Sequence, residues 1–118
     1  MILIIDDNRD LANLLCEYLS LQDYVATVAY SGKQGLAIAQ EQEVRVILCD
    51  IAMADMDGYE VARRIKSDVQ LEHIHLIAVS GFSSPEDVQR SLQAGFERHL
   101  AKPVDLVEMK KMLDSYAR

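Results

Sequence analysis

Short apolar runs alternate with longer amphipathic segments along the whole chain, and this alternation restricts the fold more than any other feature of the sequence. Runs of strand length occur at 2–5, 24–29, 44–49, 75–79 and 97–101, and four of them are rich in β-branched or aromatic residues. Apolar residues recur at helical spacing in the segment after each run. Five strand–helix units in strict alternation predict a doubly wound α/β domain, with a parallel sheet, right-handed crossovers and helices on both faces.

The helical segments carry start and stop signals. Ser31, Asp57, Ser84 and Asp105 each precede a helical segment and are followed three residues later by Gln, Asp or Glu, which is capping-box spacing or close to it. Gly95 marks the end of the fourth helix. The apolar residues expected to face the core are Leu11, Leu14, Leu15, Tyr18 and Leu19 in the first helix, Val61, Ala62 and Ile65 in the third, Val88 and Leu92 in the fourth, and Leu106, Met109 and Leu113 in the last.

Length and charge limit the classes of partner. The 118 residues suit one domain over 1–118, and 12 Lys and Arg against 19 Asp and Glu give a formal net charge of -7. An acidic surface does not neutralise phosphates, so we expect neither nucleic acid nor membrane as a partner of this domain. No apolar stretch approaches the length of a membrane span. Cys16 and Cys49 lie in apolar contexts without CxxC spacing, which predicts buried free thiols and a cytoplasmic location.

Polar residues follow the ends of four predicted strands. They are Asp6 and Asp7 after the first strand, Asp50 after the third, Ser80 after the fourth and Lys102 after the fifth. Carboxyl ends of parallel strands meet at one edge of a sheet, where ligands bind in this class of fold. Three carboxylates without a cation would repel one another. The sequence therefore predicts a site for a hard cation, with Mg²⁺ the best fit and Mn²⁺ able to substitute.

A carboxylate beside Mg²⁺, with a hydroxyl and a lysine opposite, suits phosphoryl transfer. A carboxylate can also be the nucleophile, which forms an aspartyl phosphate. Asp50 stands alone at the end of the central strand and is the candidate nucleophile. Asp6 and Asp7 are paired on a neighbouring strand and are better placed as metal ligands.

Five segments, in this order, carry a family resemblance. They read IIDDN (4–8), LCDIAM (48–53), MDG (56–58), AVSG (78–81) and AKP (101–103). The chain resembles, from residue 2 to about 117, the receiver domain of two-component response regulators, with a pattern most similar to receivers of hybrid sensor histidine kinases. The resemblance implies a flavodoxin-like (βα)5 fold with strand order 2-1-3-4-5.

The resemblance also implies a phosphorelay function that depends on Mg²⁺. Asp50 would accept a phosphoryl group from a phosphohistidine on a sensor histidine kinase or a histidine phosphotransfer protein. Asp7 would bind the metal directly and Asp6 through water, and Ala52 would offer its backbone carbonyl. Lys102 would pair with the phosphoryl charge.

Four further expectations concern switching and lifetime. Ser80 would bond a phosphoryl oxygen and shift the fourth helix, fifth strand and fifth helix, the face that a downstream effector or output domain would read. His99 occupies the position where receivers usually carry Tyr or Phe, and is a candidate switch residue. Ala52 and Phe82 occupy positions that tune autodephosphorylation, and because both are apolar we expect a long-lived phosphoaspartate. The bond from Lys102 to Pro103 would be cis.

Two other functions compete with this interpretation. A haloacid-dehalogenase-like phosphatase also uses an aspartyl phosphate, Mg²⁺, a hydroxyl and a lysine, but needs a second acid two residues after its nucleophile on the first strand. A pseudo-receiver would be a pure interaction module and would lack one or more site residues. All of them are present here, so we expect a phosphoacceptor domain with self-catalysed phosphorylation and dephosphorylation, and not a conventional enzyme.

Overall fold

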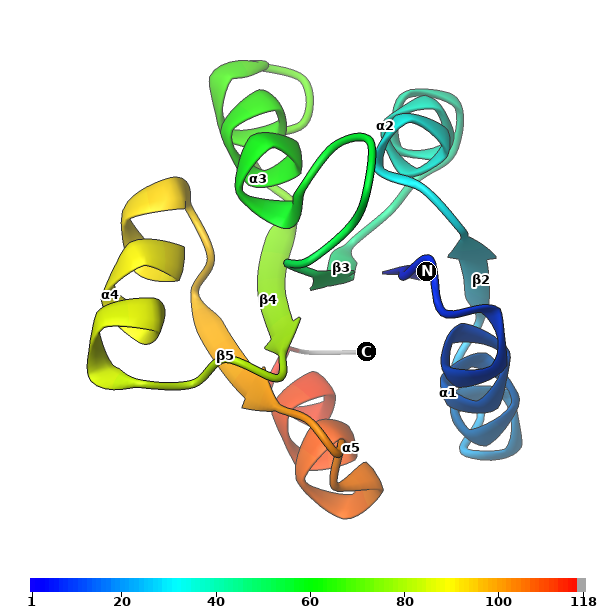
Figure 1. Ribbon diagram of the computed structural model, residues 1–118. Helices are drawn as coiled ribbons and strands as arrows, with labels where there is room; N and C mark the ends of the chain where they lie inside the picture. The colour runs from blue at the N-terminus through cyan, green and yellow to red at the C-terminus, as the bar shows by residue number, and fades with distance from the viewer. Residues whose placement is uncertain (117–118) are drawn as a thin grey trace.

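A computed structural model describes residues 1–116, and within them a strand is followed by a helix five times (Figure 1). The strands are β1 (Ile2–Ile5), β2 (Ala26–Ala29), β3 (Val46–Asp50), β4 (His75–Ser80) and β5 (Arg98–Ala101). The helices are α1 (Arg9–Leu21), α2 (Gly32–Glu41), α3 (Gly58–Ser67), α4 (Pro85–Ala94) and α5 (Leu106–Asp114). The predicted alternation of strands and helices is confirmed.

The strands form one parallel sheet in the order β2-β1-β3-β4-β5. This order confirms the predicted flavodoxin-like fold. The chain first moves outward from β1 to β2, then returns across β1 to β3 and continues in the other direction. The order of the strands thus reverses between β1 and β3, and a crevice forms at their carboxyl ends in sheets of this kind.

Helices cover both faces of the sheet. In Figure 1, α1 and α5 lie on one side and α2, α3 and α4 on the other. Successive strand residues point to opposite faces, so Leu3 and Ile5 pack in the core under α2 and α3, whereas Ile2 and Ile4 pack in the core under α1 and α5. Every residue of β1 and β3 is buried. Polar function is therefore confined to the strand ends and the loops that follow them.

The predicted helix caps are present. The side chains of Ser31, Asp57, Ser84 and Asp105 accept hydrogen bonds from backbone N–H groups in the first turns of α2, α3, α4 and α5. Asn8, which the sequence analysis did not single out, caps α1 in the same way. Gly95 ends α4 with a φ of 120°, a conformation that strongly favours glycine.

Some predicted details were wrong. In α4 the buried residues are Ser91 and Ala94, whereas Val88 is only partly buried and Leu92 is 45% exposed. The helix lies beside β5 at the edge of the sheet (Figure 1), so only a narrow strip of it faces the core, and small residues line that strip.

Two other predictions need correction on the opposite side of the sheet. In α1, Leu14 is exposed and Ala12 takes its place in the core, because the spacing pattern fixes the buried stripe only to within a residue or so. Cys49 is buried as expected, but Cys16 is only partly buried, and its thiol donates to the carbonyl of Ala26 on the edge strand β2.

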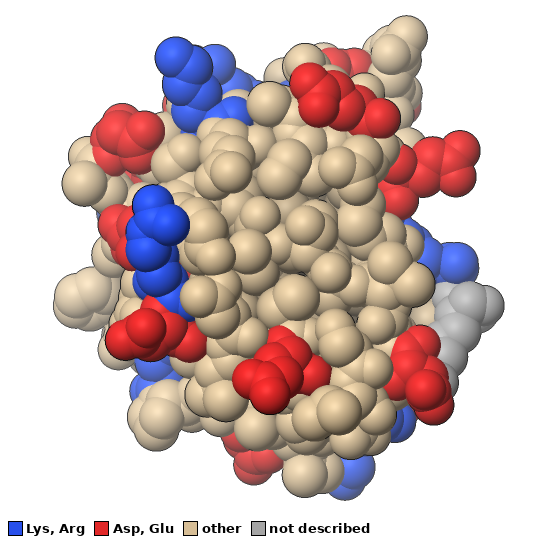
Figure 2. Space-filling model, turned by 90° about the vertical axis from the view of Figure 1, so that its right-hand side faces the viewer, with Lys and Arg blue, Asp and Glu red and all other residues tan. Residues whose placement is uncertain are grey.

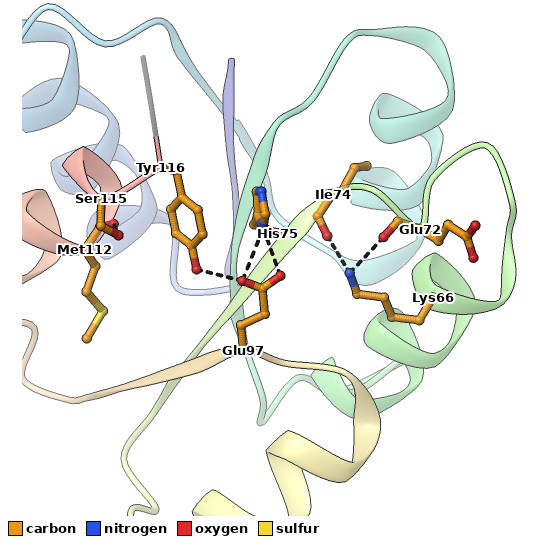
Figure 3. Close-up of polar contacts among 8 residues, drawn as sticks. All are labelled: Lys66, Glu72, Ile74, His75, Glu97, Met112, Ser115 and Tyr116. Atoms are coloured by element: carbon orange, nitrogen blue, oxygen red, sulfur yellow. Dashed lines mark hydrogen bonds and ion pairs between the residues drawn. The ribbon is translucent and has the colours of Figure 1, made fainter.

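A polar cluster ties the end of α5 to the amino ends of β4 and β5 (Figure 3). The Tyr116 hydroxyl donates to Glu97 Oε2 at 2.9 Å, and the same carboxylate contacts His75 Nδ1 at 2.9 Å. The rings of Tyr116 and His75 stack with centroids 4.3 Å apart. Burial and the Glu97 carboxylate raise the pKa of Tyr116 to about 12. This cluster lies at the end of the sheet opposite to the carboxyl ends of the strands.

Candidate functional site

Three carboxylates meet where β1 and β3 end. Asp6, Asp7 and Asp50 each offer an oxygen, and these oxygens lie within 4.8 Å of one another. Asp50 is the last residue of β3, and Asp6 and Asp7 directly follow β1, its neighbour in the sheet. Asp6 and Asp50 are 2% and 5% exposed, whereas Asp7 is exposed. The group is thus reachable from solvent on the Asp7 side.

Lys102 provides the one positive charge that is bonded to these carboxylates among the described residues. Its Nζ lies 3.3 Å from Asp6 Oδ2 and 3.3 Å from Asp50 Oδ1. The bond to Pro103 is cis, as the family resemblance implied. The backbone N–H of Lys102 donates to the carbonyl of Ser80, which fixes the end of β5 against β4.

The charges at this site alter the acidity of its groups. Burial and the nearby Asp6 carboxylate raise the pKa of Asp50 to about 6, although Lys102 and a backbone hydrogen bond from Ala52 act in the opposite direction. Burial alone would lower the pKa of Lys102, but the two carboxylates hold it above its usual value. Lys102 is therefore a permanent cation at neutral pH, and Asp50 is mostly ionised above pH 7.

The donor atoms fit a hard divalent cation. Carboxylate oxygens from the three aspartates and a backbone carbonyl from the adjoining loop are the ligands that Mg²⁺ takes in proteins. Three carboxylates face one lysine, so the site has an excess of negative charge that such a cation would balance. Ala52, two residues after Asp50, lies in that loop and is exposed.

The loop after β3 is folded tightly against the site. Gly58 donates its backbone N–H to the carbonyl of Ile51, 2.9 Å away. A Cβ at Gly58 would come within 2.4 Å of the Asp50 carbonyl oxygen, so only glycine permits this approach. The start of α3 therefore rests directly on the end of β3 and holds the loop in place.

Ser80 lies at the end of β4, beside Asp50. Its hydroxyl is buried and accepts a hydrogen bond from the backbone N–H of Phe82, 2.9 Å away. Register supports the proximity, because Asp50 pairs with Val79 across the two strands. Phe82 itself is 66% exposed and Ala52 is also exposed, and each follows a residue of the site by two positions, Phe82 after Ser80 and Ala52 after Asp50.

His99 lies farther along, on β5, and contacts two serines. Its Nε2 is 3.1 Å from Ser83 Oγ, and its Nδ1 is 3.3 Å from Ser91 Oγ. Neither serine was among the site residues predicted from the sequence. Neither serine left a signal in the sequence: Ser91 is polar within a helix whose apolar residues were expected to face the core, and the contact of Ser83 depends on how its loop folds.

Charge on the surface is unevenly distributed. Figure 2 shows the side formed by α1, β2 and α2, where uncharged residues cover most of the face and charged side chains stand mainly around it.

A hollow of about 800 Å³ lies at the amino ends of the strands, with Met1, Arg45, His73 and His75 among its lining residues. This hollow lies at the end of the sheet opposite to the carboxylate site, and no group of three potential metal ligands is found there within residues 1–116. None of the helices in residues 1–116 is long and apolar enough to cross a membrane.

Comparison with known proteins gives consistent similarities. The family model described as the response regulator receiver domain matches residues 2–114. The chain is 30% identical to the polar-differentiation response regulator DivK of Brucella ovis, over 98% of this chain and 94% of that protein. The chemotaxis protein CheY4 of Vibrio cholerae superposes with a TM-score of 0.91 at 25% identity, over 97% of this chain and 95% of CheY4. The signal receiver domain of a signal transduction histidine kinase from Syntrophus aciditrophicus superposes with a TM-score of 0.86 at 29% identity, over 99% of this chain and 92% of that domain.

Proposed function

The chain belongs to the response regulator receiver domain family, whose members act in phosphorelay signalling, and from that premise we propose that Asp50 is its phosphoacceptor. The observation that carries the proposal is the position of the Asp50 carboxylate, at the end of the central strand, 3.3 Å from Lys102 and grouped with two further carboxylates. Asp6 differs from Asp50 in that its carboxylate also accepts a hydrogen bond from the backbone N–H of Asn8, which supports a role for Asp6 as a metal ligand.

The geometry supports a direct transfer. The Asp50 carboxylate attacks the phosphorus of a phosphohistidine on a histidine kinase or phosphotransfer protein, so that a P–O bond forms and the P–N bond to the imidazole breaks. Asp6, Asp7, Asp50 and the Ala52 carbonyl would hold Mg²⁺, or Mn²⁺, which supplies neutralisation of the phosphoryl charge when bound. Lys102 is close enough to pair with a phosphoryl oxygen on Asp50.

The proposal extends to the partner side of the domain. Ser80 would turn to a phosphoryl oxygen, and the resulting shift would reach α4, β5 and α5, the face for an effector or output domain. Residues 1–118 would act as one receiver domain in the cytoplasm. The family is not one of conventional enzymes, and the phosphorylation and dephosphorylation would be catalysed by the domain itself.

The two competing functions fit less well. A haloacid-dehalogenase-like phosphatase needs an acid two residues after its nucleophile, but Asn8 follows Asp6 at that distance and caps α1. The corresponding residue after Asp50 is Ala52. A pseudo-receiver would lack part of the site, whereas the three aspartates, Ser80 and Lys102 are all in place.

Incubation with Mg²⁺ and acetyl phosphate, followed by intact mass spectrometry, tests the proposal. We expect one phosphoryl adduct on the wild type, loss of the adduct on Asp50→Ala and retention on Asp55→Ala, a control in the same loop. Absence of an adduct on the wild type, or an undiminished adduct on Asp50→Ala, would contradict the proposal. Chelation of the metal should abolish the adduct.

A further inference from the structure

His99 is held at both ring nitrogens by hydroxyl groups from different segments. Ser83, in the loop between β4 and α4, contacts Nε2 at 3.1 Å, and Ser91, inside α4, contacts Nδ1 at 3.3 Å. Ser91 is fully buried, so its hydroxyl has no water to bond. His99 thus joins β5 to the loop on one side and to α4 on the other.

The direction of each hydrogen bond follows from the donors available. The Ser91 hydroxyl donates to the carbonyl of Val88, 2.8 Å away, and a hydroxyl has one proton to give. Ser91 must therefore accept from His99, which places a proton on Nδ1. In a neutral imidazole Nε2 is then bare and can accept a proton. The Ser83 hydroxyl has two acceptors within reach, His99 Nε2 at 3.1 Å and the Ser80 carbonyl at 3.4 Å, and the shorter contact, with His99, takes its one proton. The hydrogen bonds thus fix His99 as the Nδ1–H tautomer. A histidine ring without such partners could adopt either tautomer.

The same loop is bonded to the hydroxyl of Ser80. Phe82 donates its backbone N–H to Ser80 Oγ, and the carbonyl of Ser80, 3.4 Å from Ser83 Oγ, is the second acceptor within reach of the Ser83 hydroxyl. If Ser80 turns toward a phosphoryl group on Asp50, Phe82 loses its acceptor. Phe82 and Ser83 are adjacent in the chain, so a displacement of Phe82 carries Ser83 with it.

We propose that Ser83 and Ser91 are positioning residues that hold His99 between the Ser80 loop and α4, so that phosphorylation reaches α4 through loss of the Ser83–His99 hydrogen bond. The proposal rests on the proposed phosphorylation of Asp50. In this mechanism the ring does not swing inward as an aromatic switch residue does. The His99 ring stays bonded to Ser91, and only its hydrogen bond with Ser83 is lost. A merely structural histidine would have the same neighbours but would transmit nothing.

The first test needs no phosphorylation. Nitrogen-15 NMR of the wild type, at a pH where the imidazole signals report the neutral ring, should show His99 as the Nδ1–H tautomer. Ser91→Ala should shift it toward Nε2–H, because the acceptor at Nδ1 is gone. Ser67→Ala is a matched control, since the Ser67 hydroxyl also donates to a carbonyl three residues earlier. An Nε2–H tautomer in the wild type, or no change in Ser91→Ala, would overturn the proposed bond directions.

The second test measures transmission. Phosphorylated and unphosphorylated samples of the wild type, Ser83→Ala and Ser83→Thr are compared by intact mass and by amide chemical shifts of α4. All three should carry the adduct. In Ser83→Ala the change in the α4 amide shifts on phosphorylation should be about twofold smaller, or smaller still, which corresponds to the lower end of the effect that single residues have on coupling between sites. Ser83→Thr keeps the hydroxyl and should restore it. A full shift change in Ser83→Ala would refute the coupling, whereas a wild type without adduct would refute the phosphorylation proposal and leave the tautomer result standing.

Discussion

Ala52 and Phe82 lie two residues after Asp50 and Ser80, and neither side chain can hold a water molecule by hydrogen bonding. Both side chains are exposed, and neither offers a donor or an acceptor. Hydrolysis of an aspartyl phosphate needs a water aligned with the phosphorus. At the scale of single residues, these two apolar side chains would therefore favour a slow loss of the phosphoryl group that we propose Asp50 accepts.

We predict that polar side chains at these two positions shorten the lifetime of the phosphoaspartate. Ala52→Asn combined with Phe82→Gln should accelerate its decay by roughly three- to tenfold, which corresponds to one hydrogen bond of ordinary strength in the transition state. The decay is followed by intact mass after removal of the phosphodonor. Ala54→Asn, at an exposed position of the same loop, is the control. A lifetime unchanged by the double substitution would show that these positions only face solvent.

The residues of the site were predictable to different degrees. Asp6, Asp50 and Lys102 could be found because carboxyl ends of parallel strands must meet, whatever the details of packing. Ser83 and Ser91 could not, because their contacts with His99 depend on how closely α4 approaches β5. That distance is set by side-chain volumes across an interface between segments, which no local pattern in the sequence encodes.

At the scale of elements, the strands and helices themselves were the most predictable part. The capping residues and Gly95 confirm their predicted roles because each acts within one turn of its own helix. The prediction of which residues of α1 and α4 are buried was partly wrong, because burial does not depend on one turn of the helix alone. Which stripe of a helix is buried depends on where the helix sits on the sheet, and α4 covers only an edge.

The cluster at the end of α5 predicts a pH effect on the stability of that helix. Burial alone would raise the pKa of Glu97, but hydrogen bonds from His75 and Tyr116 hold it below the usual value. A depressed carboxyl pKa stabilises the folded state above the ordinary pKa of glutamate, and this contribution is lost as the pH falls through the folded-state pKa. The contribution is small, because the side chain is 38% exposed.

Glu97→Gln should therefore lower the free energy of unfolding at pH 7 by about 0.5 kcal/mol. The difference from the wild type should shrink below pH 4. Urea unfolding at several pH values measures it, and Tyr116→Phe, which keeps the ring on His75 but removes the hydroxyl, should show a loss of similar size. Glu17→Gln on the exposed side of α1 serves as the control. An equal difference at pH 7 and pH 3 would exclude the carboxylate as its cause.

At the scale of the whole molecule, the carboxylate site lowers the free energy of unfolding. The pKa of Asp50 is raised to about 6 by burial and by Asp6, so its ionised form is less favourable in the folded chain than in the unfolded one. For this raised pKa the sign is opposite to that of Glu97. The contribution of Asp50 to the free energy of unfolding is most favourable below the ordinary pKa of aspartate, and it is lost as the pH rises through about 6.

Asp50→Asn should accordingly be more stable than the wild type at pH 7.5 without divalent cations, by about 1–3 kcal/mol. The gap should close near pH 3, where Asp50 is protonated in both states. Addition of Mg²⁺ should raise the thermal midpoint of the wild type more than that of Asp50→Asn, because a cation that binds only the folded state stabilises it. Asp55→Asn should behave as the wild type. A destabilised Asp50→Asn at pH 7.5 would contradict this prediction. It would show that the ion pair between Lys102 and Asp50 stabilises the fold more than the buried charge of Asp50 destabilises it.

The position of Lys102 has a consequence for handling the protein. Its ammonium lies 3.3 Å from two of the three carboxylates and serves as a tethered counterion, one that chelators cannot remove. The domain should therefore keep its fold when stripped of divalent ions, unlike small proteins whose folding requires a metal. Chelation then becomes a reversible chemical control: activity that disappears with EDTA and returns with Mg²⁺ reports on the phosphoryl chemistry, and not on unfolding.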